Sequence, residues 1–148
     1  MTDVGAFYQE LILEHHRNPR NTGRLSDATH SGDANNPLCG DRTSLTLRLE
    51  DGRVQGARCE VQGCAICRAS SSMMTEAIIG KSVGEASMLV EQFLGMIGGT
   101  LGETDDGSQQ GRDALLGPLV AFGQVRHFPS RARCATLSWE VLRRALAG

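Results

Sequence analysis

The feature that most constrains the fold is a β-hairpin predicted in the first half of the chain. Residues 43–49 alternate leucine with polar side chains, which is the pattern of a strand with one buried face. An Asp51-Gly52 pair follows, and such pairs are favoured in two-residue hairpin loops. Residues 54–61 then alternate again, with Cys59 on the apolar side as a small core residue. Because one face of this hairpin is apolar, other elements must cover it.

Helical spacing of apolar residues predicts the elements that cover the hairpin. Ser82 followed by Glu85 is a capping box, which marks the start of one of these helices. Residues 24–36 are polar and predict a loop with one short edge strand at most, and residues 98–112 predict a solvated, Gly-rich loop. The expected helices span residues 3–16, 64–79, 83–97 and about 131–147, with two short helical pieces within 113–125.

Length and composition place these elements in one domain. The chain has 148 residues, of which 40% are hydrophobic, and this suffices for a single core. We therefore predict one domain over residues 1–148 with an α+β fold, a small antiparallel sheet packed on one side by about five helices. The net charge of −2 is spread along the chain, which gives no basic surface for nucleic acid or an anionic membrane. No apolar run approaches the roughly 20 residues that span a bilayer.

The five cysteines are the most informative residues for function. The first residues do not read as a signal peptide, so we expect a cytoplasmic protein with reduced thiols, used for metal binding or catalysis. Cys39 and Asp41 stand two residues apart in a turn and could face one ion. Cys64 begins a predicted helix and Cys134 is expected in the first turn of the last one, positions that favour a thiolate. Three thiolates and a carboxylate would satisfy tetrahedral zinc.

The spacing of the cysteines alone is weak evidence, because it matches no zinc-finger period, and other interpretations stay open. Cys64 and Cys67 form a Cys-x-x-Cys pair, but a thioredoxin-like redox site needs a βαβ context, of which an antiparallel hairpin followed by helices is a poor version. Cys67 fits either a packing residue or a spare ligand or sulfur acceptor.

Long ordered blocks of the sequence carry a more specific resemblance, which covers nearly the whole chain. The blocks are Tyr8–His16 with Asn18–Asn21, Asn36–Asp41, Gly63–Ile66 with Ala69–Ala77, and Phe128–Trp139. In these blocks the chain resembles the iron–sulfur assembly scaffold family typified by IscU and the amino-terminal part of NifU, and within it the SufU branch. Arg133 stands where the IscU type has a histidine before the last cysteine, and residues 80–124 supply an insertion typical of the SufU type.

The resemblance implies a site, a cofactor and a partner. Carried over by position, the family's functional residues are Cys39, Asp41, Cys64 and Cys134, and the sheet has three strands rather than the two seen in the sequence. Proteins similar to this one bind zinc and accept sulfur from a SufS-type cysteine desulfurase, which uses pyridoxal phosphate. We therefore expect a sulfurtransferase-like acceptor in iron–sulfur cluster assembly that takes persulfide sulfur through Cys39 and serves downstream cluster-assembly proteins.

Two further hypotheses share the same residues. In the first, the three cysteines hold a transient [2Fe–2S] cluster for transfer to apo-proteins, and Asp41 keeps that cluster labile. In the second, the zinc is purely structural in a module that binds partners. Within the sulfur-transfer hypothesis, Arg131 is the residue nearest to Cys134 that could pair with Asp41 when the carboxylate leaves the ion.

Overall fold

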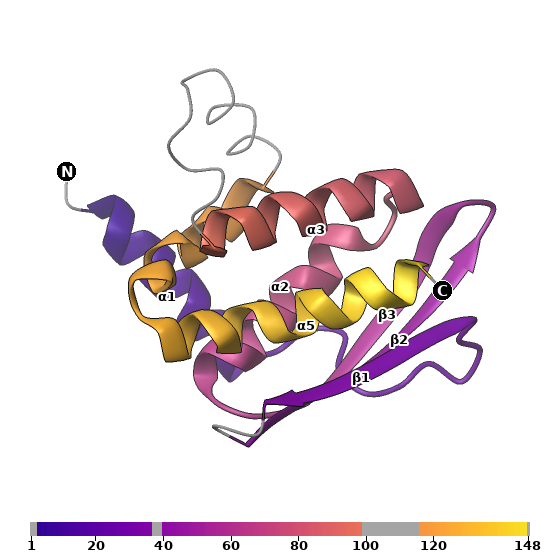
Figure 1. Cartoon of the computed structure of the whole chain (residues 1–148), viewed down its shortest axis with the longest axis horizontal. Coiled ribbons are helices and arrows are strands. Elements are labelled where there is room, and N and C mark those ends of the chain that lie inside the picture. Colours follow the sequence, from indigo (N-terminus) through magenta and orange to yellow (C-terminus); the bar gives the residue numbers. More distant parts are fainter. Residues whose placement is uncertain (1–2, 37–39, 99–115, 148) are drawn as a thin grey trace.

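The computed structural model describes residues 3–36, 40–98 and 116–147. One helix comes first, three consecutive strands follow it, and the rest of the described chain is helical (Figure 1). The elements are α1 (Asp3–Arg17), β1 (His30–Asn36), β2 (Asp41–Glu50), β3 (Arg53–Gln62), α2 (Ala65–Ile78), α3 (Val83–Gly98), the 3₁₀ helix η1 (Gly117–His127) and α5 (Pro129–Ala147).

The three strands form one antiparallel sheet in the order β1-β2-β3, and the predicted hairpin is its centre. Asp51 and Gly52 both have positive φ, 55° and 73°, as a tight two-residue hairpin turn requires. Leu45 pairs with Cys59 across the hairpin, and both side chains are buried. The polar segment expected to hold at most one short edge strand forms the seven-residue strand β1, which completes the three strands implied by the resemblance.

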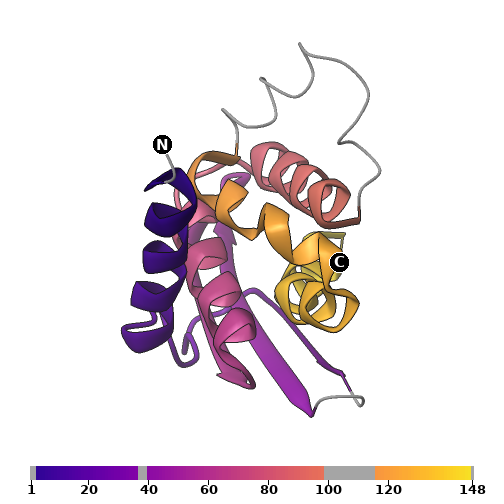
Figure 2. The same cartoon turned by 90° about the vertical axis from the view of Figure 1, so that its left-hand side faces the viewer.

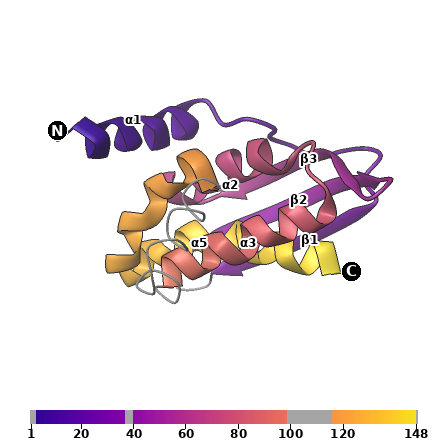
Figure 3. The ribbon, with the colours of Figure 1, turned by 90° about the horizontal axis from the view of Figure 1, so that it is seen from above.

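The described helices all lie on one face of the sheet (Figures 1 and 2). α2 and α5 lie against that face, α3 packs on α5, and α1 lies along the outer side of α2 (Figure 3). Trp139 of α5 is fully buried and stacks on Phe93 of α3, with ring centroids 4.3 Å apart. The fold class predicted from the sequence is therefore confirmed.

The helix ends show where local sequence determined the fold and where it did not. The capping box is confirmed, because the Glu85 N–H donates to Ser82 Oγ at 3.0 Å and the Ser82 N–H donates to Glu85 Oε1 at 2.9 Å. α5 begins at Pro129, two residues earlier than predicted, because proline is well suited to a helix's first position. Cys134 is consequently the sixth residue of α5, so its expected place in the first turn was wrong.

The long segment after α3 is only partly described. Of the two helical pieces expected within residues 113–125, the second corresponds to η1. Residues 99–115, which include most of the predicted solvated loop and the start of the first piece, lie outside the described residues. Within the part of the chain that the structure describes, no helix is long and apolar enough to cross a membrane.

The buried His15 predicts a pH dependence of stability. Its ring is 4% exposed and contacts Ser72 Oγ at 2.7 Å, and burial, aided by the Arg20 guanidinium, lowers its pKa below 6.5 despite the opposing effect of Glu76. The unfolded chain therefore binds a proton at this histidine more readily than the folded chain does. The contribution of neutral His15 to the free energy of unfolding is complete above pH 6.5 and is lost as the pH falls below 6.5. We expect His15→Gln to flatten the pH dependence of the unfolding free energy between pH 7.5 and 5.5 in urea titrations. An equally steep dependence in the variant would contradict this assignment.

Candidate metal centre

Three residues far apart in sequence meet at one end of the molecule. Asp41 is the first residue of β2, Cys64 immediately precedes α2, and Cys134 lies in the second turn of α5. One carboxylate oxygen of Asp41 and the two sulfur atoms all lie within 4.8 Å of one another. The antiparallel hairpin makes this possible, because it returns the chain from the start of β2 to the end of β3, next to Asp41.

The backbone before α2 holds the Asp41 carboxylate in place. Asp41 is 2% exposed, and its Oδ1 accepts a hydrogen bond of 3.3 Å from the Cys64 N–H. A Cβ atom at Gly63 would lie 2.6 Å from the same oxygen, closer than such atoms approach in proteins. Only glycine lets the chain pass this close to the carboxylate. Sequence reasoning missed this role of Gly63, because nothing in the local pattern shows which side chain a glycine faces.

The two cysteines of the site differ in exposure. Cys64 is exposed, whereas Cys134 is only 6% exposed. Burial raises the pKa of the Cys134 thiol far above its usual value, and the hydrogen bonds to Asp41 and Cys64 raise it further. The expectation that its helix position favours a thiolate was therefore wrong for the protein without an ion, because desolvation and a neighbouring carboxylate outweigh the helix terminus from the second turn.

The remaining candidate residues have different outcomes. Cys39 lies outside the described residues, so its place in the site stays a prediction. Arg131 is exposed on the first turn of α5, and its pairing with Asp41 also stays a prediction. Cys67 is fully buried, with its sulfur 3.8 Å from Thr43 Oγ1, and packs in the small cluster that contains Cys134.

Cys59 belongs to the core of the sheet. It is buried, and desolvation raises its pKa to about 12, so its thiol stays protonated at neutral pH. This matches the packing role predicted for it from strand alternation.

The donor set defines what the centre can bind. The two thiols supply soft sulfur donors and the carboxylate a hard oxygen donor, a combination that suits zinc and also iron in sulfur-rich sites. Asp41 of β2, Cys64 just before α2 and Cys134 of α5 are three donors, which leaves the fourth position of a tetrahedron for another ligand. Because Cys64 is exposed, the centre is accessible from the side of that thiol.

The fold and this donor set agree with the sequence comparison. The family model described as "NifU-like N terminal domain" matches residues 7–134, and the chain belongs to this family. The resemblance stated from the sequence blocks is thereby confirmed.

Individual relatives match along nearly the whole chain. The chain is 41% identical over 145 residues to the "zinc-dependent sulfurtransferase SufU" of Bacillus subtilis, a match that covers 98% of this chain and 92% of the relative. It is 35% identical over 139 residues to the "iron-sulfur cluster assembly scaffold protein IscU" of Thermotoga maritima, covering 94% and 92%. A crystal structure of a putative iron–sulfur cluster assembly scaffold protein for the SUF system from Fervidobacterium islandicum superposes with a TM-score of 0.81 at 30% identity, covering 93% and 94%.

Proposed function

We propose that this chain is a zinc-dependent sulfur acceptor in iron–sulfur cluster assembly. The observation that supports this most is the convergence of Asp41, Cys64 and Cys134 within 4.8 Å, at the positions that the family resemblance assigns to function. The similarity to a zinc-dependent sulfurtransferase over 98% of the chain supports the same proposal.

The residues present fit a zinc ion. Zinc–sulfur bonds of about 2.3 Å in a tetrahedron separate ligand atoms by somewhat less than 4 Å, so the described donors need to close by about 1 Å or less. Cys39 would be the fourth ligand, since it stands two residues before Asp41. When bound, zinc keeps thiols deprotonated at neutral pH and holds them in place.

In the proposed reaction, Cys39 accepts sulfur from a partner enzyme. The donor is a pyridoxal-phosphate-dependent cysteine desulfurase of the SufS type that carries a persulfide on its own cysteine. The Cys39 thiolate attacks the outer sulfur, a new S–S bond forms, and the old S–S bond breaks with the desulfurase thiolate as leaving group. Cys39 then carries the persulfide, which a downstream assembly protein takes up.

A scaffold for a [2Fe–2S] cluster is the second candidate function. The similarity to IscU of Thermotoga maritima favours it, together with the oxygen donor Asp41 between two thiols. Here the cluster is cargo, and a carboxylate ligand would make it easier to release than an all-thiolate set. The insertion in residues 80–124 and Arg133 in place of a histidine favour sulfur transfer over this alternative.

A desulfurase assay tests the proposal. The wild-type chain should stimulate alanine formation from cysteine by a SufS-type desulfurase in the presence of reductant, whereas Cys39→Ser should fold normally and give no stimulation. Mass spectrometry should find added sulfur on wild-type Cys39. If Cys39→Ser stimulates the enzyme as well as the wild type does, the centre is a structural module and the proposal is wrong.

A second variant tests the role of Arg131. If this side chain pairs with Asp41 during the exchange of ligands, Arg131→Ala should slow desulfurase activation and leave the zinc content unchanged. Arg133→Ala is the matched control, because Arg133 is also exposed on α5 and has no assigned part in the exchange. Loss of zinc from Arg131→Ala would show a structural role instead.

A further inference from the structure

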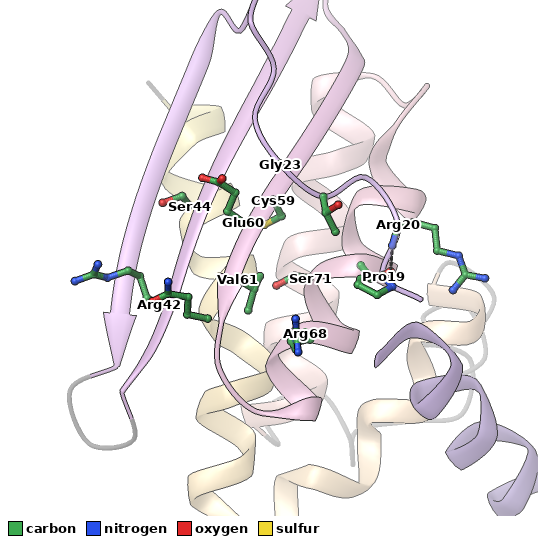
Figure 4. Close-up of a pocket in the computed structure, with 13 residues that line it drawn as sticks. Pro19, Arg20, Gly23, Arg42, Ser44, Cys59, Glu60, Val61, Arg68 and Ser71 are labelled. Atoms are coloured by element: carbon green, nitrogen blue, oxygen red, sulfur yellow. Dashed lines mark hydrogen bonds between the residues drawn. The ribbon is translucent and has the colours of Figure 1, made fainter. Parts of the chain in front are cut away.

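A groove runs along the outer edge of β3 and has no part in the proposed chemistry. It has a volume of about 650 Å³ and is bordered by β3, the first half of α2 and the segment that follows α1. Figure 4 shows Val61, Ser71 and Arg68 close together in the groove, with Pro19 facing them from the other side. β3 is an edge strand, and within the described residues no fourth strand of the sheet pairs with it on this side.

Two segments of the chain itself cover the upper part of this edge. Val54 exchanges hydrogen bonds with Gly80 and Lys81, at 2.8 and 2.9 Å. Further along, the Cys59 N–H donates to Asn21 O at 2.9 Å, and the Gly23 N–H donates to Cys59 O at 3.2 Å. The backbone N–H and C=O of Cys59 therefore point away from β2, toward the outer edge of the sheet.

The next outward position on the strand is open. In an antiparallel pair the backbone groups of alternate residues point to the same side, so the N–H and C=O of Val61 point outward as those of Cys59 do. Among the residues that the structure describes, Val61 has no hydrogen-bond partner on that side. Exposed strand edges of this kind accept an extended peptide as an additional strand.

The groove leads directly to the candidate metal centre. Val61 stands three residues before Cys64, and β3 ends at Gln62. A strand spans about 3.3 Å per residue, so Val61 lies within about 10 Å of Cys64, and a peptide paired with Val61 would lie one strand spacing, about 4.8 Å, further out. A partner that reaches the metal centre is therefore positioned to use this edge.

The charge of the groove indicates what kind of peptide fits. Arg68 lies inside it and has no ion pair among the described residues, whereas the lining Glu60 is already paired with Arg24 at 3.4 Å. Arg20 and Arg42 border the groove at its two sides, with their guanidinium groups turned outward. An extended segment with an Asp or Glu side chain would complement Arg68.

We propose that an extended acidic segment of the sulfur donor pairs with β3 at Val61, as a fourth strand, with its carboxylate on Arg68. This inference rests on the proposed function, because it takes the cysteine desulfurase as the partner. The segment fixes the orientation of the donor relative to Cys64.

Amide hydrogen exchange of the full chain, with and without a SufS-type desulfurase, tests the proposal. A new backbone hydrogen bond should slow exchange of the Val61 amide at least about tenfold in the complex. The Val54 amide, which is already bonded, and the amides of β1 at the opposite edge should not change. An unchanged Val61 amide in a complex that forms would overturn the proposal.

Paired variants test the same contacts by affinity. Val61→Pro removes the outward N–H without removing a bond to β2, and Val61→Ala keeps it, so the proline variant should bind the desulfurase about tenfold more weakly than the alanine variant. Arg68→Glu should also weaken binding, with reduced dependence on salt. Arg144→Glu is the matched control, as an exposed arginine ten residues beyond Cys134 on α5. The circular dichroism spectrum and the zinc content should match the wild type in all four variants, the two at Val61 and those at Arg68 and Arg144.

The outcomes separate this inference from the function on which it rests. If the wild type neither binds nor activates the desulfurase, the proposed function fails. If the wild type binds and activates while Val61→Pro and Arg68→Glu match their controls, only the strand-addition proposal fails.

Discussion

Cys134→Ser is expected to lower zinc affinity by more than about a hundredfold. A serine hydroxyl is not deprotonated at neutral pH and is a poor zinc ligand. Removing only a hydrogen-bond partner of a zinc ligand already lowers metal affinity about 10- to 100-fold, so removing a ligand itself should lower it more. Competition with a zinc-binding chromophore measures this affinity. Cys134 is buried beside the Asp41 carboxylate, and the described donor group holds one other thiol, Cys64.

Cys67→Ser is the matched control for this variant. The variant makes the same sulfur-to-oxygen change. Cys67 is also buried and packs in the same small cluster as Cys134, but it is not part of the donor group found among the described residues. We expect it to keep zinc with wild-type affinity. If Cys134→Ser binds zinc as tightly as Cys67→Ser does, the assignment of Cys134 as a ligand is wrong.

Gly63→Ala is expected to lower zinc affinity about 10- to 100-fold without unfolding the protein. The added methyl group would lie 2.6 Å from Asp41 Oδ1, so the carboxylate must move away from the two thiols. The same shift would lengthen the hydrogen bond from the Cys64 N–H. The backbone itself permits alanine, because Gly63 is not among the residues with positive φ.

Gly56→Ala provides the comparison for Gly63→Ala. It places a methyl group in β3, where the nearest atom is Leu25 Cδ1 at an ordinary contact distance of 3.4 Å. Both variants should unfold at similar temperatures, and only Gly63→Ala should lose zinc affinity. Equal affinity in the two variants would show that the close approach to Asp41 does not matter for binding.

The parts of the fold that sequence predicts well are those determined by neighbouring residues. The hairpin follows from the alternation of residues 43–49 and from the Asp51-Gly52 turn, and the start of α3 follows from Ser82 and Glu85. β1 carried a weaker signal, because its polar residues have no apolar alternation and its pairing comes from the backbone of β2.

The geometry of the site depended on contacts between distant segments. Sequence blocks identified Asp41, Cys64 and Cys134 through the family resemblance, and the structure brings them together. The raised pKa of Cys134 and the close approach of Gly63 to Asp41 could not be predicted, since burial and the position of the segment after β3 beside the start of β2 are properties of the folded chain.

Metal analysis of the chain purified without added metal, combined with its visible absorption spectrum, tests the central claim most directly. If the centre is a zinc site for sulfur transfer, the protein should contain about one zinc ion per chain and have no visible colour. A brown protein with iron, acid-labile sulfide and charge-transfer bands would contradict the claim and establish the cluster scaffold instead.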